Sequence, residues 1–203
     1  MNSWRPALAG LVVIALAAHA RASDTWSVNV YGRPDDGRLV AINEAVEYWN
    51  ATLEALHATL RLGPVTQTEM TLSDATLREI SDTTLARGRR IEPPLPLAHG
   101  KGDINIALSN TDLVSVGWPP AAGRKGFVIL RQGDVPPLSL PNVARNVAAH
   151  EIGHVLGLPH NSDPTLLMCG RPAECRPAEF RSPVKKFFPL TDEEKRFLAK
   201  RYK

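Results

Sequence analysis

Residues 150–160 of the chain read HEIGHVLGLPH, with histidines at positions 150, 154 and 160 and a glutamate at position 151. On a helix, residues four apart leave the axis only about 40° apart in rotation, so His150 and His154 present their imidazoles on one face. Gly157 is placed to end this helix, because glycine readily adopts the left-handed conformation found at helix ends. The chain then turns and brings His160 back to the same place.

Three converging imidazoles predict a catalytic zinc site. Neutral imidazole nitrogens bind zinc at about 2.0 to 2.1 Å, and three such ligands leave the fourth tetrahedral position open to water. Zinc lowers the pKa of that water toward about 7, and Glu151 is placed to take its proton as a general base and pass it to a leaving amine. The spacing therefore predicts one catalytic zinc ion held by His150, His154 and His160. The alternative is a helix whose histidines are ordinary core or surface residues.

The residues that follow the third histidine carry a family resemblance. Met168 comes eight residues after His160, at the end of the run NSDPTLLM. The stretch 150–168 resembles the matrixin family of metzincin-clan zinc peptidases, whose site reads His-Glu-x-Gly-His-x-x-Gly-x-x-His and continues through Ser, Asp and Leu-Met. The resemblance implies that Glu151 is the catalytic base. It also implies that Met168 forms the Met-turn, which packs beneath the imidazoles without binding the metal.

The sequence departs from the matrixin pattern in two places. Matrixins usually follow the methionine with Tyr-Pro, and part of that segment walls the pocket for the side chain just after the cleaved bond. Here Cys169 and Gly170 take those positions, so the resemblance does not define the pocket. Matrixins also bind a second, structural zinc through several upstream histidines and an aspartate. Only His99 lies between the first expected helix and the motif, so we predict no such site.

Two cysteines follow the Met-turn directly. Cys169 and Cys175 are the only cysteines of the chain. If the protein is exported, it folds in an oxidising compartment, and we predict a disulfide between them that closes a short loop beneath the site. The rival interpretation, a contribution to a metal site, lacks a second pair of ligands.

The amino terminus indicates export. Arg5 precedes an apolar run at 7–18, and an Ala-Arg-Ala pattern ends at Ala22, so we predict a signal peptide over residues 1–22 with cleavage after Ala22. Twelve apolar residues are few for spanning a bilayer, although an uncleaved anchor remains the alternative. The expected location is secreted or periplasmic. The remaining residues, 23–203, have the length for one domain with one core.

Charge gives no sign of a nucleic-acid or membrane partner. Removing residues 1–22 deletes Arg5 and Arg21 and no acidic residue, so the net charge falls from +3 to +1. The chain carries no repeats and no nucleic-acid motif. We expect a polypeptide substrate, no stable membrane insertion and a monomer.

Hydrophobic periodicity predicts an α+β fold. Apolar and polar residues alternate where we expect strands, and apolar residues recur every three or four positions where we expect helices. The expected strands are 26–31, 61–70, 103–108 and 126–131; the expected helices are 38–60, 73–86, one capped by Asn142 that carries the motif, and a C-terminal helix at 190–202 capped by Thr191. By resemblance, this is a metzincin catalytic domain with a twisted mixed sheet and a long backing helix.

The resemblance also suggests how substrate binds. In metzincins the edge strand of the sheet lies antiparallel to bound substrate above the zinc, and Phe127, Val128, Ile129 and Leu130 match that place. An extended peptide would complete such an edge by main-chain hydrogen bonds. The alternative is an ordinary strand.

Together these observations predict a secreted zinc-dependent metalloendopeptidase. Two other classes stay open. One is a zinc-containing binding module that has lost catalysis. The other is a zinc hydrolase of non-protein amides or cell-wall crosslinks, since specificity resides in loops.

Overall fold

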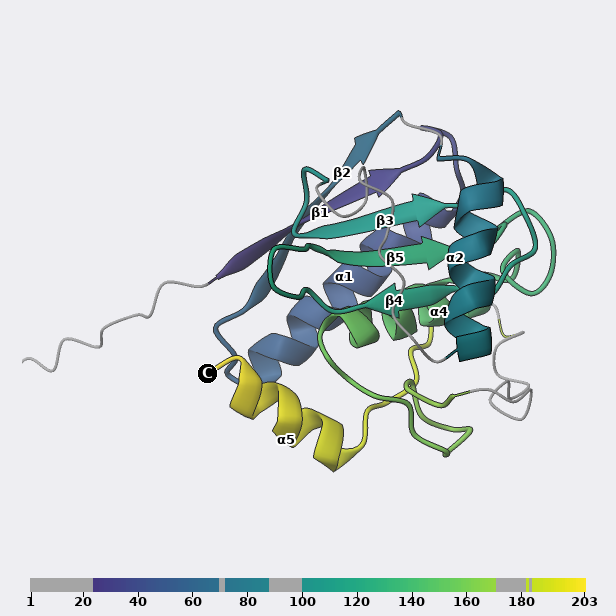
Figure 1. The fold of residues 1–203 in the computed structure, drawn as a ribbon. Coiled ribbons are helices and arrows are strands. Elements are labelled where there is room, and N and C mark those ends of the chain that lie inside the picture. The colour runs from purple at the N-terminus through teal and green to yellow at the C-terminus, as the bar shows by residue number, and fades with distance from the viewer. Residues whose placement is uncertain (1–23, 70–71, 88–99, 171–181, 183) are drawn as a thin grey trace, which may run out of the picture.

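The computed structural model describes residues 24–69, 72–87, 100–170, 182 and 184–203, which form a sheet covered by helices (Figure 1). The strands are β1 (Thr25–Tyr31), β2 (Arg61–Thr68), β3 (Ile104–Leu108), β4 (Val116–Trp118) and β5 (Gly126–Leu130). The helices within the described ranges are α1 (Arg38–Ala55), α2 (Asp74–Arg87), α4 (Pro141–Val155) and α5 (Asp192–Arg201).

The sheet is mixed, which confirms the predicted α+β class. Its five strands run in the order β2-β1-β3-β5-β4. The first four strands are parallel to one another. The fifth, β4, pairs antiparallel with β5 and stands at one end of the sheet. Figure 1 shows α1 crossing behind the sheet and α5 lying below it.

Side chains pack against both faces of the sheet. The buried strand residues that join the cluster with α1 and α4 are Val28, Val30, Leu62, Ile104, Ile106, Leu108, Val128 and Leu130. Those that join the cluster with α2 are Tyr31, Ala107, Val116, Trp118, Phe127 and Ile129, together with Leu77 and Ile80 of the helix. Burial on both faces explains why every residue of β3 and β5 is buried, as is usual for parallel strands covered by helices.

The prediction that Phe127, Val128, Ile129 and Leu130 form the edge strand is wrong. They belong to β5, which has β3 on one side and β4 on the other. The short run Val116–Trp118, which lies outside the strands that we expected, pairs with Phe127, Val128 and Ile129 and takes the end position. A strand of only a few residues, inside a segment rich in Gly and Pro, leaves little periodicity to detect.

Helix α1 ends earlier than its apolar stripe predicts. The stripe indicated a helix to residue 60, but the last helical residue is Ala55 and His57 has a left-handed φ of 54°. The N–H of Ala58 donates to the carbonyl of Leu53 (2.9 Å) and the N–H of His57 donates to that of Glu54 (2.9 Å), the Schellman pattern of a helix end. His57 thus terminates the helix and is not part of its surface.

The C-terminal helix begins as predicted. The Thr191 hydroxyl accepts from the N–H of Glu194 (3.0 Å), and the Glu194 carboxylate accepts from the N–H of Thr191 (2.8 Å). This reciprocal capping box satisfies two backbone donors that a helix start leaves unpaired.

Two predictions lie outside the described residues: the signal peptide at 1–22, and Cys175 with its disulfide. None of the helices in the described part of the chain combines the length and the apolar character that crossing a bilayer requires.

Trp49 joins α1 to α4 and should be the main determinant of their packing. It is fully buried, and its indole N–H donates to the carbonyl of Ala149 (2.9 Å). We expect Trp49→Ala to lower the free energy of unfolding by roughly 3–5 kcal/mol, because it removes a large buried ring and leaves a cavity. Urea unfolding measures this change. Val40→Ala, at an exposed position of the same helix, should alter stability by no more than about 0.5 kcal/mol. Equal effects of the two substitutions would contradict this account.

Candidate metal centre and active site

Helix α4 carries His150, Glu151 and His154, and its start differs from the prediction. The helix begins after Leu140 with Pro141 in the first turn, where a missing N–H costs no hydrogen bond. The expectation that Asn142 caps it is wrong, because Pro141 starts the helix before that residue. Asn142 is fully buried within the first turn, and its amide donates to the carbonyl oxygens of Ser182 and Val184 (2.7 Å each).

Gly157 ends α4 as the sequence predicts. Its φ of 97° lies in the left-handed region that favours glycine. The N–H of Leu158 donates to the carbonyl of Gly153 (3.0 Å), and that of Gly157 donates to the carbonyl of His154 (3.0 Å), which closes a second Schellman turn. This turn reverses the chain and returns His160 toward the helix.

The structure brings the three imidazoles together. The Nε2 atom of His160 lies 2.9 Å from that of His154 and 3.2 Å from that of His150. Three ligands at 2.0 to 2.1 Å from a metal at the centre of a tetrahedron would be about 3.4 Å apart. The three residues can therefore hold a metal ion, and all their ligand atoms lie within 4.8 Å of one another.

Backbone carbonyls fix the orientation of both helix histidines. Nδ1 of His150 lies 2.7 Å from the carbonyl oxygen of Leu167, and Nδ1 of His154 lies 2.8 Å from that of Leu158. Because a carbonyl can only accept, we assign the proton of each neutral ring to Nδ1. The Nε2 atoms therefore face each other with lone pairs, which is the tautomer that a metal ligand needs.

Burial keeps these rings neutral. It lowers the pKa of His150 from 6.5 to about 3, with a further contribution from neighbouring His154. It also lowers the pKa of His154 to about 4. Both imidazoles are thus unprotonated near neutral pH and available as ligands.

Met168 lies under the helix between the two helix histidines. It is fully buried, and a Cβ added at Gly153 would stand 2.6 Å from its sulfur. Only glycine fits at that position without displacing the methionine. The N–H of Asn161 donates to the Met168 carbonyl (2.8 Å), so the loop after the third histidine is tied to the chain beneath the site. This placement agrees with the Met-turn that the resemblance implies.

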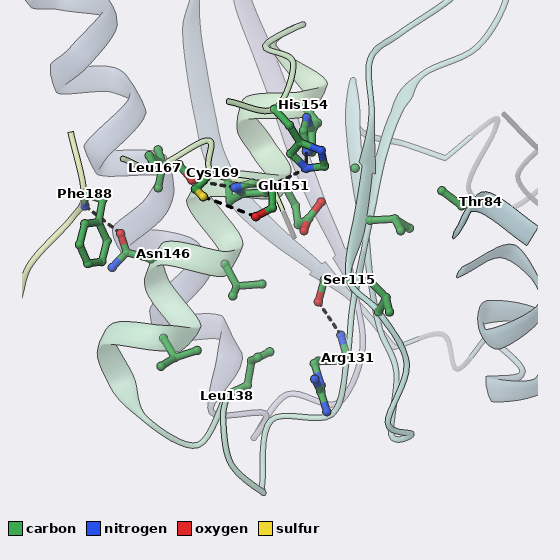
Figure 2. A pocket seen from close by; sticks show the side chains of 18 of the residues that line it. Thr84, Ser115, Arg131, Leu138, Asn146, Glu151, His154, Leu167, Cys169 and Phe188 are labelled. Atoms are coloured by element: carbon green, nitrogen blue, oxygen red, sulfur yellow. Dashed lines mark hydrogen bonds between the residues drawn. The ribbon is translucent and has the colours of Figure 1, made fainter. Parts of the chain in front are cut away.

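Glu151 lines a cavity of about 340 Å³ together with the three histidines. Figure 2 shows Glu151 and His154 leaving α4 toward this space. The glutamate side chain is largely shielded from solvent, with the residue 6 % exposed. Cys169, which is 9 % exposed, also contributes to the lining.

Strand β4 faces α4 across the cavity. Val116, Gly117 and Trp118 all line it, whereas Phe127, Val128, Ile129 and Leu130 are not among the described residues that do. Among the described residues, β4 and not β5 is therefore the strand that borders the cavity. Sequence reasoning also missed Asn146 and Phe188 as lining residues. The spacing of Asn146 from His150 would have placed it on the ligand face, but Phe188 comes from a distant segment without a local signal.

Comparisons with known proteins agree with this geometry. A sequence model of the Matrixin family matches residues 139–183. The crystal structure of archaemetzincin from Methanopyrus kandleri is similar in fold, with a TM-score of 0.50, 14 % sequence identity, and coverage of 89 % of this chain and 96 % of that one. No curated protein sequence matches the chain significantly. The sequence match covers the stretch that holds the three histidines, and the structural match shows a similar fold.

We expect the metal-free protein to lose stability as the pH falls from 7 to 5. The unfolded chain binds protons at its histidines near pH 6.5, whereas His150 and His154 stay neutral in the folded protein down to about pH 4. The unfolded state therefore binds more protons in this window. Each of the two histidines should lower the free energy of unfolding by roughly 1 kcal/mol for every pH unit below about pH 6.

Urea unfolding of chelator-treated protein at several pH values measures this slope. His150→Gln should reduce the slope, because it removes one of the two buried titrating groups. His57→Asn changes an exposed histidine at a left-handed position that asparagine tolerates, and should leave the slope unchanged. The same slope in the wild type and in His150→Gln would rule out this origin.

Proposed function

We propose that the chain is an exported zinc-dependent endopeptidase. The observation that carries the proposal is the meeting of three imidazoles and the buried Glu151 carboxylate in one cavity, which an end strand of the sheet also lines. This combination supplies a metal site, a proton acceptor and a place for an extended chain.

His150, His154 and His160 would hold one zinc ion. Their donor set fits, because all three are imidazoles and the two on the helix present unprotonated Nε2 atoms. A bound zinc ion supplies Lewis acidity, which lowers the pKa of water toward about 7 and polarises a carbonyl group.

Glu151 is the group placed to move the proton. Directly after His150 on α4, it lines the same cavity and is largely shielded from solvent. As general base, its carboxylate takes a proton from the water that attacks the scissile carbonyl, and then donates it to the nitrogen that leaves. The peptide bond and one water are thereby converted to a carboxylic acid and an amine.

Strand β4 would hold the substrate main chain. It has β5 on one side and stands at the end of the described sheet, beside the cavity that contains the histidines. An extended peptide can add to such a strand through backbone hydrogen bonds, which hold many different sequences in the same orientation. This supports a polypeptide substrate cut at internal bonds.

Export and the disulfide complete the proposal. The signal-peptide pattern of residues 1–22 supports a secreted or periplasmic location, and an oxidising compartment favours pairing of Cys169 with Cys175. The buried position of Cys169 beside Met168 would let the disulfide stabilise the chain under the metal site.

Glu151→Gln should separate metal binding from catalysis. We expect the variant to keep one zinc per chain by elemental analysis and to lose activity by about 10²–10⁴-fold, because the amide cannot accept the proton. Glu54→Gln, an exposed residue of α1, serves as the matched control and should retain full activity. A Glu151→Gln protein with most of its activity would exclude this residue as the base.

The activity itself is tested with an unstructured polypeptide. The wild type should make internal cuts that stop when a chelator is added and resume when zinc is restored. If polypeptides stay intact while cell-wall crosslinks or other amides are cleaved, the peptidase assignment is wrong. If zinc is bound but no substrate is hydrolysed, the chain is a binding module.

The disulfide can be tested by counting thiols in the unfolded, unreduced protein. We expect none, and reduction should lower the free energy of unfolding by about 2 kcal/mol, because closing a short loop restricts the unfolded chain. Two titratable thiols before reduction would disprove the pairing.

A further inference from the structure

We propose that the last turn of α2 forms a subsite in which Leu85 contacts a substrate side chain, on the opposite face of the sheet from α4. The occupant is an apolar side chain of the peptide that adds to β4. This inference rests on the proposed peptidase function and deepens it. It assigns a role to an exposed apolar residue of the cavity lining that neither the metal site nor the proton transfer uses.

The cavity that holds the histidines reaches helices on both faces of the sheet. Glu151 lines it from α4, whereas Thr84 and Leu85 line it from the last turn of α2. The two helices belong to different hydrophobic clusters, α4 on one face of the strands and α2 on the other. In Figure 2, Thr84 accordingly stands across the strands from Glu151. Because β5 has a strand on each side, the cavity connects the two faces at the end of the described sheet, where β4 lines it.

The side chains of β4 show how the two faces are divided. Val116 and Trp118 pack in the cluster with α2, whereas a Cβ added at Gly117 would stand 2.2 Å from the carbonyl oxygen of Glu151 on α4. Successive residues of β4 thus point to alternate faces. A peptide strand added to β4 lies in the same sheet, so its side chains alternate in the same way. Each residue that points toward α4 and the metal therefore has neighbours that point toward α2.

The end of α2 is fastened beside β4 by a buried serine. The hydroxyl of Ser81, which is fully buried, donates to the carbonyl of Val114 (2.8 Å) and accepts from the N–H of the same residue (3.1 Å). Leu85 follows Ser81 by about one helical turn, so it leaves α2 on nearly the same side. Figure 1 shows α2 running past β3, β5 and β4. The serine therefore holds Leu85 at the approach to the strand that the peptide joins.

The chemistry of this subsite favours an apolar contact. Leu85 is 50 % exposed, so part of its surface is open to a partner. The Thr84 hydroxyl donates to the carbonyl of Ile80 (2.6 Å), and its proton is thus already used. Arg131 also lines the cavity, but its guanidinium forms an ion pair with Asp112, which reduces its attraction for an acidic substrate. An apolar side chain that covers Leu85 removes apolar surface of both partners from water, which favours binding.

The test measures which side chains are preferred at each of the two substrate positions on either side of the cleaved bond. Peptides that differ at one position, with leucine, lysine or glutamate there, compete for cleavage in one tube. The ratio of their kcat/KM values then does not depend on the fraction of active enzyme. At the position that contacts α2, the wild type should show a kcat/KM for the leucine peptide more than about threefold above that for either charged peptide.

Leu85→Lys and Leu85→Glu identify that position. Because Leu85 is exposed, both variants should fold and keep the zinc content of the wild type. Leu85→Lys should raise the glutamate-to-lysine ratio at least about fivefold at one position, since opposite charges then meet there, and Leu85→Glu should lower it by about the same factor. The adjacent positions should stay within about twofold of the wild type, because their side chains point to the other face.

Val40→Lys is the matched control. Val40 is an exposed apolar residue of α1 that is not among the described residues lining the cavity, and the variant adds the same charge to the protein. Its ratios should stay within about twofold of the wild type at every position, because salt screens an exposed charge outside the cavity. A ratio that shifts equally at all positions, or equally in Val40→Lys and Leu85→Lys, would show a general charge effect and overturn the proposal.

Two further results would refute the subsite and leave the peptidase function standing. One is normal cleavage by the wild type with unchanged ratios at all positions in both Leu85 variants. The other is a wild-type preference for glutamate over leucine at the affected position, which would assign that position to Arg131. Absence of cleavage by the wild type would refute the proposed function as well.

Discussion

The site depends on one constraint: the unprotonated Nε2 atoms of His150 and His154 both face the Nε2 atom of a third imidazole, that of His160. His150 and His154 donate their Nδ1 protons to backbone carbonyls, so each brings a lone pair to the Nε2 atom of His160, at 3.2 and 2.9 Å. A single proton on His160 could hydrogen-bond to only one of these two lone pairs, whereas a metal cation can be bound by all three nitrogens. The fold therefore holds an arrangement that a bound metal completes, and metal binding should be linked to stability.

Helix α1, the segment that carries Met168 and the sheet all pack around the helix that carries two of the histidines. Trp49 and Met168 both pack against α4 at Gly153. The sheet supports the other side of the cavity, and its end strand β4 brings backbone groups to the metal site. Asn142 and Asn146 bond the backbone of a distant segment, so α4 holds both the metal ligands and that segment.

Much of this could be predicted from the sequence because the signals are local. The spacing of the histidines, the glycine that ends α4 and the capping box of α5 all act within a few residues. The errors concern features that depend on distant partners. Asn142 resembled a helix cap but bonds a segment some 40 residues away. The run Phe127–Leu130 was read as an edge, although four consecutive apolar residues fit a strand covered on both faces better. The true end strand, β4, is too short to show a pattern of its own.

X-ray absorption spectroscopy of the zinc-loaded protein tests the central claim most directly. The account predicts three imidazole nitrogens and one oxygen ligand at about 2.0 to 2.1 Å, with no sulfur in the coordination sphere. His160→Ala should remove one imidazole contribution or abolish zinc binding. A sulfur ligand at about 2.3 Å would indicate a closed structural site that includes a cysteine. That result, or a folded protein that binds no zinc, would contradict the account.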